Sequence, residues 1–385
     1  MPKLFDVDLD LWILFLVYGG LFGISAIEFY EVFPTTSYLS LSILLWITLV
    51  FCCWYFSFTC SRKFIKQANE DFLDIPNKRS SHRKPTPRGG GKFFFLGFLL
   101  GNILLKYIWS ASLISSGLGR DLFTIQLLIL YCVSIQDDQG HVSARLRYLV
   151  HFLVAILAFS FGRVPLPIFG QSPDVIHILG VLLTFLFITG FINLYNFMDG
   201  LDGLVAGTVL VQTVFLALYL HQPALIPLAA GLVGFLRWNW SPAKVFMGDV
   251  GSTTLGAIII LALINGSGMN TDWGTTPELF WSAIAITFPL IGDATYTIFR
   301  RLLRQENIFK AHRFHIYQRL HQSGWTHRQV ALTYIAVTGI IAVLIYQWDL
   351  AGSAIAALLT LAGILSAELY LQNKGKLTPP SKSDA

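Results

Sequence analysis

The chain has 385 residues, of which 54% are hydrophobic and only 13% are charged. Soluble domains carry about a quarter charged residues, so this composition argues against a soluble enzyme or a soluble binding module. The formal net charge of +5 gives no reason to expect nucleic acid as a partner, because the Lys and Arg residues that produce it lie mainly in loops between apolar segments.

Apolar segments of about 20 residues, the length that crosses a bilayer, recur along the whole chain. Each must be helical, since lipid offers no hydrogen-bond partner to an open backbone. The expected spans are 9–29, 39–60, 93–115, 121–136, 147–162, 174–195, 204–220, 223–239, 253–269, 278–299, 330–348 and 351–371. This pattern predicts an all-α, polytopic transmembrane helical bundle of about 11–12 spans.

One integral-membrane domain is expected over residues 1–372, followed by a polar, disordered tail at 373–385. The first span lacks the basic start and the small-residue cleavage site of a signal peptide, which favours a membrane anchor. The four cysteines lie in or beside apolar spans without a metal-binding spacing, and this indicates a packing role.

Basic residues mark the side of the membrane that each loop faces, because Lys and Arg concentrate in cytoplasmic loops. The gap 61–92 holds nine of them and the gap 300–329 holds seven, whereas the odd-numbered gaps hold only Arg120 and Arg163. The even-numbered gaps and both termini are therefore predicted to be cytoplasmic.

Five polar clusters interrupt the apolar pattern, and each lies in an even-numbered gap. They are Asp74–Gly91, Asp137-Asp138, Asn196–Gly203, Phe246–Asp249 and His312–His315. Although they are far apart in sequence, helices that cross a bilayer would bring all five clusters to one membrane face.

The first cluster is basic and contains several prolines and glycines. Arg79, His82 and Arg88 are suited to grip phosphates. The glycines after Arg88 expose backbone N–H groups, which suits an anion-binding nest. A basic anchor that touches only lipid headgroups is the alternative. It accounts for the charge, but not for the order Pro85-Thr86-Pro87-Arg88-Gly-Gly-Gly91.

Carboxylates dominate the second and third clusters. Asp137-Asp138 ends the fourth span, where adjacent carboxylates repel and would share a proton or a cation. The alternative is a solvated helix end. Asp199 and Asp202 would share one face if their segment were helical, and the glycine after each lets a ligand approach the backbone. An Asp-Gly turn between helices is the alternative, although a turn needs only one such pair.

The fourth cluster precedes the ninth span. Asp249 and Ser252 can cap that helix, whose N-terminus also favours an anion. Phe246 offers an aromatic face on which a base could stack, and a role in the core is the alternative.

Two histidines define the fifth cluster. His312 and His315 lie beside Arg313, so anion or phosphate contacts are favoured over zinc, which would need more nitrogen or sulfur ligands. An amphipathic helix at the membrane interface is the alternative.

Together the clusters supply hard oxygen ligands among basic side chains. Such carboxylates suit Mg²⁺, with Mn²⁺ as a substitute, and Mg²⁺ binds through one or two carboxylates plus substrate phosphates. The carboxylates concerned are Asp137, Asp138, Asp199, Asp202, Asp249 and Asp293. This set predicts phosphoryl chemistry on a diphosphate at the cytoplasmic face, with a lipid substrate that enters from the bilayer.

The motifs resemble those of the polyprenyl-phosphate N-acetylhexosamine-1-phosphate transferase family, in its order and over roughly residues 40–350. The segment Pro76–Gly91 is most similar to the branch that initiates O-antigen synthesis. The resemblance implies transfer of sugar 1-phosphate from a UDP-N-acetylhexosamine to undecaprenyl phosphate, with release of UMP. It also implies a bacterial inner membrane protein that contacts membrane lipids and acts at the cytoplasmic face.

The resemblance and the residue chemistry together give expected roles. Catalytic roles are expected for Asp137, Asp138, Asp249, His312 and His315. Substrate contacts are expected from Asn196, Asp199, Asp202, Phe246, Arg79, His82, Thr86, Arg88 and Arg313. Metal contacts are expected from Asp249, Asp138 and Asp199. We expect direct in-line attack by the lipid phosphate, with a covalent aspartyl-phosphate route as the competitor.

Other functions remain open at this point. Synthesis of the first lipid intermediate of peptidoglycan is an alternative, although His312-Arg-Phe-His315 replaces the three consecutive histidines of that enzyme. A transporter or a structural scaffold would explain the spans but not the clustered motifs. The sugar is left open among GlcNAc, FucNAc and QuiNAc, and so is a homodimer.

Overall fold

The computed structural model describes residues 39–68, 70–76, 81–82, 84–108, 118–140, 142–159, 174–265, 277–308, 310 and 312–375. The chain divides into two compact units, Met1–Thr48 and Leu49–Ala385. Of the first unit, only residues 39–48 are described, and they form the beginning of one helix. The candidate site and the other helices belong to the second unit.

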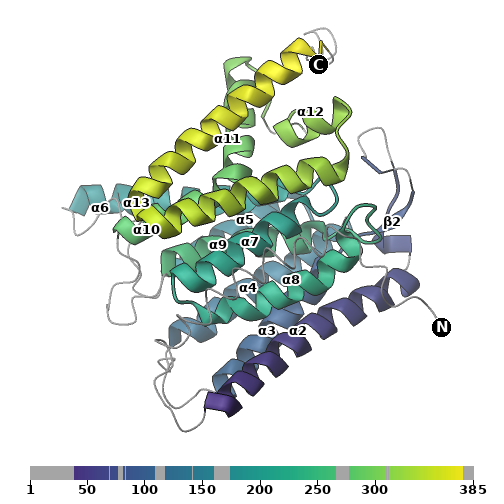
Figure 1. Ribbon diagram of the computed structural model, residues 1–385, viewed down its shortest axis with the longest axis vertical. Coiled ribbons are helices and arrows are strands. Elements are labelled where there is room, and N and C mark those ends of the chain that lie inside the picture. The colour runs from purple at the N-terminus through teal and green to yellow at the C-terminus, as the bar shows by residue number, and fades with distance from the viewer. Residues whose placement is uncertain are drawn as a thin grey trace. The chain divides into compact units, whose positions relative to one another are not determined.

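Helices make up nearly all of the described residues (Figure 1). They are α2 (Leu39–Gln67), α3 (Gly91–Ile108), α4 (Leu118–Asp138), α5 (Ala144–Phe159), α6 (Asp174–Met198), α7 (Leu204–Tyr219), α8 (Ile226–Asn239), α9 (Gly248–Asn265), α10 (Pro277–Ile284), α11 (Phe288–Leu303), α12 (Ile316–Gln322) and α13 (His327–Asn373). Short 3₁₀ turns lie at Glu70–Phe72, Pro223–Leu225 and Ala285–Thr287. The strands β1 (Leu73–Asp74) and β2 (Thr86–Pro87) form a short antiparallel ladder.

Each predicted span from 39–60 to 351–371 is largely helical where the structure describes it, while the span 9–29 lies outside the described residues. The span 278–299 is divided into α10 and α11. Pro289 stands in the first turn of α11, where its missing N–H is not needed. The last two spans are joined in α13, which breaks at Asp349 with φ 44°. The all-α polytopic membrane fold is confirmed.

Four helices in the described parts of the chain are long and apolar enough to cross a membrane by themselves. Within the described residues these are Ile43–Gln67, Ile178–Met198, Glu278–Leu303 and His327–Asn373. Several predicted spans form shorter helices. For example, α7 has 16 residues and extends about 24 Å, against a hydrocarbon core of about 30 Å. The predicted number of about 11–12 spans counted every such segment as a complete crossing.

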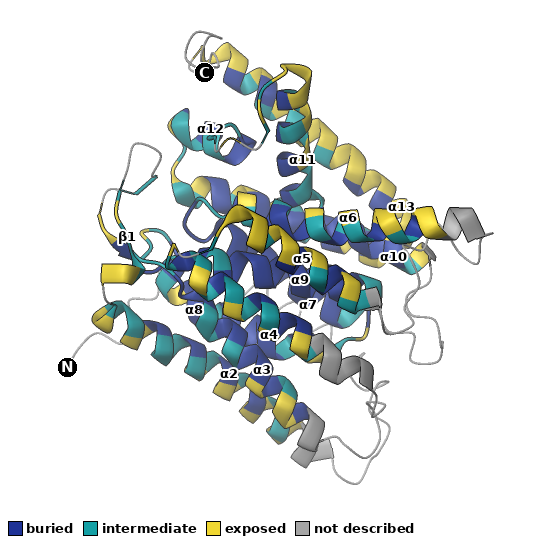
Figure 2. Cartoon of the chain, turned by 180° about the vertical axis from the view of Figure 1, so that it is seen from behind, coloured by how far each residue is buried: buried dark blue, intermediate teal, exposed yellow. Residues whose placement is uncertain are grey.

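Two helices form the interior of the second unit. Every residue of α7 from Leu204 to Ala217 is buried, and α9 packs against α3, α4 and α6. Peripheral helices instead expose apolar faces, as the yellow positions on α6 and α13 show (Figure 2). On α6, Leu179, Leu182 and Leu186 are all more than half exposed. Such a surface suits lipid as the surrounding solvent.

Candidate active site

The five polar clusters meet at one end of the helices of the second unit. Asp138, the last residue of α4, contacts the first turn of α9. The Ser252 hydroxyl of α9 donates a hydrogen bond to Asn196 at the end of α6, over 2.8 Å. Tyr317 of α12 donates to the carbonyl of Phe197 over 3.0 Å. The predicted convergence is therefore confirmed, while the side of the membrane stays a prediction.

Asp138 joins three segments of the chain. Its carboxylate accepts hydrogen bonds from the N–H groups of Asp249, at 2.7 Å, and Val250, at 3.1 Å. These are orphan donors at the start of α9, so a side chain from α4 caps this helix. Arg88 Nε lies 3.3 Å from the same carboxylate, whose side chain is 1% exposed. Burial raises the pKa of Asp138 to about 6, although Arg88 and the two N–H groups lower it.

Gly248 makes this capping possible. Its φ is 73°, a conformation that side chains other than glycine rarely adopt. A Cβ atom at this position would also collide with the carboxylate of Asp138. Residue 248 in Phe246-Met-Gly-Asp249 is therefore glycine because the carboxylate of Asp138 occupies the space that a side chain would need.

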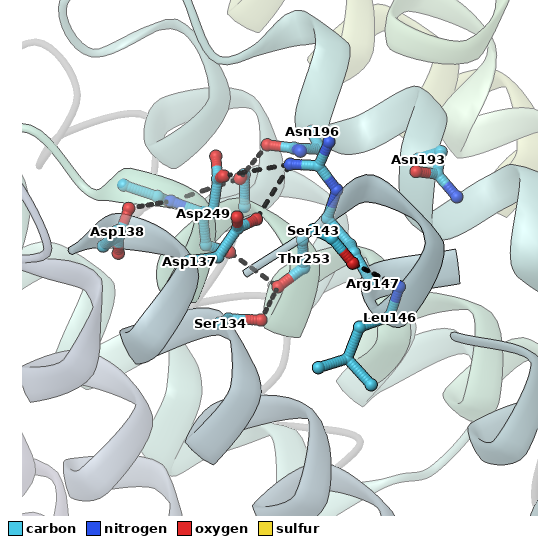
Figure 3. A network of polar contacts seen from close by, with 12 residues as sticks. Ser134, Asp137, Asp138, Ser143, Leu146, Arg147, Asn193, Asn196, Asp249 and Thr253 are labelled. Atoms are coloured by element: carbon cyan, nitrogen blue, oxygen red, sulfur yellow. Dashed lines mark hydrogen bonds and ion pairs between the residues drawn. The ribbon is translucent and has the colours of Figure 1, made fainter. Parts of the chain in front are cut away.

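Arg147, at the start of α5, bridges two further carboxylates (Figure 3). Its Nη1 atom lies 2.8 Å from Asp137 Oδ2 and 3.4 Å from Asp249 Oδ2. Sequence reasoning did not single out Arg147. A basic residue at the edge of an apolar span is unusual, and this was the available signal.

Asp199 differs from these neighbours. Its side chain is half-buried, yet no described residue donates a hydrogen bond to it or forms an ion pair with it. Burial, together with the negative charges of Asp249 and Asp138, raises its pKa to about 8. A positively charged ligand would stabilise the ionised form of such a carboxyl group.

A divalent cation fits this part of the site. No group of three His, Cys, Asp or Glu residues in the described parts of the chain is close enough to hold a metal without other ligands. Mg²⁺, however, commonly takes only one or two carboxylates and completes its shell with phosphates and water. Asp199 and Asp249 provide this, whereas both carboxylate oxygens of Asp138 already accept hydrogen bonds. The metal site stays a prediction.

Asp202 has a different set of contacts from Asp199. Its Oδ2 accepts from the N–H of Ala243 at 3.1 Å, and its Oδ1 lies 3.1 Å from His327 Nδ1. Burial opposes ionisation of Asp202, but its hydrogen bond with His327 and the charge of that ring outweigh it and lower the pKa. The two aspartates do not share a helical face. Because α6 ends at Met198 and α7 begins at Leu204, both lie in a non-helical loop.

Phe246 and the described residues of the basic first cluster, Asp74–Gly91, form another side of the site. The Phe246 N–H donates to the carbonyl of Pro87, at 2.8 Å, and its carbonyl accepts from Gly90 at 2.9 Å. The ring of His82 meets that of Phe246 edge to face, with centroids 4.9 Å apart. The Thr86 hydroxyl donates to the carbonyl of Lys84, which is a local contact. Arg79 lies outside the described residues.

The fifth cluster, His312–His315, forms a loop directly before α12, which we call the histidine loop. It reaches the site through α12. Asp293 accepts hydrogen bonds from the N–H groups of Ile316, at 2.8 Å, and Tyr317, at 3.0 Å. His315 is buried and its ring lies 4.9 Å from that of His312. Burial, followed by the charges of His315 and Arg301, lowers the pKa of His312 to about 3. His312 therefore offers a neutral imidazole near pH 7.

Arg313 belongs to the same loop. Its carbonyl accepts a hydrogen bond from the Gln322 side chain over 3.2 Å, which ties the loop to the far end of α12. The expected substrate contact of its guanidinium stays a prediction.

Comparison with known proteins adds independent findings. Residues 122–267 match the family described as Glycosyl transferase family 4. The chain is 31% identical over 276 residues to a protein of Bacillus subtilis (strain 168) named probable undecaprenyl-phosphate N-acetylglucosaminyl 1-phosphate transferase, which covers 68% of this chain and 72% of that protein.

Two further relatives have similar names. The undecaprenyl-phosphate alpha-N-acetylglucosaminyl 1-phosphate transferase of Thermotoga maritima is 30% identical over 257 residues, with 65% of this chain and 74% of that protein covered. Its namesake in Escherichia coli (strain K12) is 29% identical over 286 residues, with 70% and 74% covered.

Proposed function

The chain belongs to glycosyl transferase family 4, and on this basis we propose that it transfers N-acetylhexosamine 1-phosphate from a UDP-N-acetylhexosamine to undecaprenyl phosphate. The product would be undecaprenyl-pyrophosphoryl-N-acetylhexosamine, with UMP released. The names of the relatives favour N-acetylglucosamine as the sugar. The reaction would be the first membrane step of O-antigen or another cell-envelope polysaccharide, at the cytoplasmic face of the inner membrane.

One observation carries the proposal: Asp199 and Asp249 lie among basic side chains at the end of helices that expose apolar faces. Burial and the charges of Asp249 and Asp138 raise the pKa of Asp199, whereas the positive charge of Arg88 opposes this shift. A diphosphate needs cationic partners, and a polyprenyl chain needs an apolar surface next to them. Arg88 supplies a cation there, and Leu146 and Leu149 of α5, beside Arg147, are 45% and 61% exposed.

The bond changes are balanced without a co-reactant. An oxygen of the lipid phosphate attacks the phosphorus that bears the sugar, and the bridging bond between the two phosphoryl groups of the donor breaks. One P–O–P bridge forms and one is lost, so the step is close to reversible. A phosphate monoester is mostly ionised at pH 7, since its second pKa is near 6, and little proton removal is needed.

The side chains then act mainly by positioning, as in other phosphoryl transfers. Asp199 and Asp249 would hold Mg²⁺, which supplies charge neutralisation at the phosphates when bound. Arg88, about one third exposed, is placed to donate to a phosphate oxygen. Asp137 would orient the lipid phosphate or take its residual proton. Asp138 supports the site indirectly by capping α9.

The binding wall for the nucleotide would be formed by Phe246 and His82. Their edge-to-face contact leaves the ring of Phe246 only half-buried, and a uracil ring could stack on it. The neutral His312 would contact the diphosphate or the sugar as a hydrogen-bond partner.

The test uses the full chain in nanodiscs with undecaprenyl phosphate and a panel of UDP-sugars. Release of UMP that requires Mg²⁺ is expected with at least one UDP-N-acetylhexosamine, and Asp249→Asn should abolish it. Glu278→Gln, which removes an exposed carboxylate at the start of α10, is the matched control and should retain turnover. Absence of turnover with every UDP-N-acetylhexosamine would refute the proposal.

A further inference from the structure

The C-terminal half of α13, after the break at Asp349, carries a buried carboxylate on a helix whose outer face is apolar and exposed. Leu358, Leu365 and Leu369 are 68%, 52% and 61% exposed, whereas Glu368 is only 7% exposed. Burial of a carboxylate on a helix with an apolar outer face is costly, and such groups are usually paired or functional. Glu368 therefore requires an explanation that its neighbours do not.

Arg319 of α12 is the partner of Glu368. Its Nη1 and Nη2 atoms donate to the two carboxylate oxygens, the second over 2.9 Å. Arg319 is itself 3% exposed. Arg300 of α11 lies 3.7 Å from the same carboxylate. A two-pronged Arg–carboxylate pair fixes orientation as well as distance, so Glu368 determines where α12 lies between α11 and the last half of α13.

The opposite end of α12 carries the groups that face the candidate site. Asp293 accepts the N–H groups of Ile316 and Tyr317. The Tyr317 hydroxyl reaches the Asn196–Gly203 loop at the carbonyl of Phe197, over 3.0 Å. A Cβ atom at Gly200 would collide with that hydroxyl. Because α12 spans only Ile316–Gln322, a shift at Arg319 would be transmitted to His315 and Tyr317 within about one helical turn.

We propose that Glu368 is a positioning residue and that the C-terminal half of α13 clamps α12, so that the histidine loop is held against the Asn196–Gly203 loop. The clamp is supplied by a segment outside residues 122–267, the part that matches the family. The consequence for turnover rests on the proposed function. The clamp itself is a property of the folded chain without substrate.

A purely stabilising ion pair is the competing explanation, and local measurement separates the two. The variant is Glu368→Gln, which keeps the shape but removes the charge. Glu368→Asp keeps the charge on a shorter side chain. Glu278→Gln, at an exposed position, removes the same charge elsewhere. Amide hydrogen exchange is measured in nanodiscs without substrate, in peptides that cover 312–322 and in peptides from the buried helix α7.

In Glu368→Gln, we expect exchange over 312–322 to rise on the order of tenfold, because a hydrogen bond to a charged group is lost. Exchange in α7 should stay unchanged, Glu368→Asp should restore part of the protection, and Glu278→Gln should match the unaltered protein. With an active preparation, kcat/KM for the donor should fall about tenfold to a hundredfold through misplacement of the loop. KM for undecaprenyl phosphate should change less than about twofold, since the loop faces the donor.

Unchanged exchange over 312–322 would overturn the clamp, as would an equal rise in every helix. If Glu368→Gln fails to fold, Glu368→Met combined with Arg319→Met is used, because apolar replacement of both partners of a buried pair is often tolerated. That double variant should fold and still exchange rapidly over 312–322, and wild-type protection would refute the clamp. If neither the unaltered protein nor any variant releases UMP, the proposed function fails. The hydrogen-exchange result still shows whether Glu368 holds α12 in place.

Discussion

Asp138 and Asp199 are both aspartates beside a helix end in the candidate site, but their surroundings differ. Asp138 contacts two backbone N–H groups and Arg88. The side chain of Asp199 has no hydrogen-bond or ion-pair partner among the described residues, and burial, together with the charges of neighbouring carboxylates, raises its pKa. Within one acidic site, therefore, some carboxylates hold the helices together, whereas the side chain of Asp199 makes no such contact with the described residues. Membership of a motif does not distinguish them, whereas their partners do.

The largest expected effect is a loss of turnover without a loss of stability when Asp199 is replaced. Asp199→Asn should lower turnover about 10³-fold, comparable to removal of a group that stabilises transition-state charge. Its melting temperature should stay constant near pH 7, where a pKa of about 8 keeps Asp199 mostly neutral. At higher pH it should exceed that of the unaltered protein, because the variant lacks the carboxylate that Asp249 and Asp138 repel. UMP release and a thermal melt in detergent measure the two effects. A marked fall in melting temperature would show that Asp199 also holds the fold.

The converse is expected at Asp138. Asp138→Ala removes the carboxylate from Arg88 and from two N–H groups at the start of α9, while Arg88 keeps its hydrogen bond to the carbonyl of residue 138. The free energy of unfolding should fall by about 3 kcal/mol. Denaturant unfolding in micelles checks this, with Asp199→Ala as the matched variant. If Asp138→Ala unfolds like the unaltered protein but has lost turnover, Asp138 belongs with Asp199 in the chemistry.

Arg147 tests whether an internal cation competes with a metal. Arg147→Met removes the positive charge between Asp137 and Asp249, so affinity for Mn²⁺ should rise about tenfold. Titration followed by electron paramagnetic resonance measures it. Arg145→Met, at an exposed position two residues away, is the control and should leave the affinity unchanged. Weaker Mn²⁺ binding in Arg147→Met would contradict this competition.

The smallest effect concerns acid stability at Asp202. The pKa of Asp202 in the folded protein is lowered. Ionised Asp202 therefore stabilises the fold at pH values above the ordinary pKa of an aspartate, which is about 4. This contribution is lost as the pH falls below that value. In Asp202→Asn, unfolding free energy should depend less on pH in this acid range. An identical acid dependence in both proteins would show that the contact with His327 contributes no stability.

The helices were largely predictable because hydropathy acts locally. An interruption of the apolar pattern at 349–350 separated the last two predicted spans, and the backbone does break at Asp349. The break at Pro289 was missed, since its neighbours remain apolar and the proline sits where a new helix can begin.

The residue types of the site were predictable from the sequence, but the structural role of each residue was not. Asp138 and Asp249 are separated by 111 positions, and a sequence does not reveal that one caps the helix of the other. Arg147 and Glu368 were missed for the same reason: each looks like an isolated charge until its partner is known. Asp199 and Asp202 do not meet the condition for sharing a helical face, because α6 ends at Met198 and both lie in the loop before α7, where the Asp-Gly turn was the alternative.

The break at Asp349 also links the histidine loop to the thickness of the bilayer. Residues 350–373 form a helical segment about 36 Å long, more than the hydrocarbon core of about 30 Å. A segment of that length adjusts to its membrane by tilting, and Glu368 near its end is bonded to α12. Acyl-chain length would thus alter the tilt of this segment and, through Glu368, the position of α12.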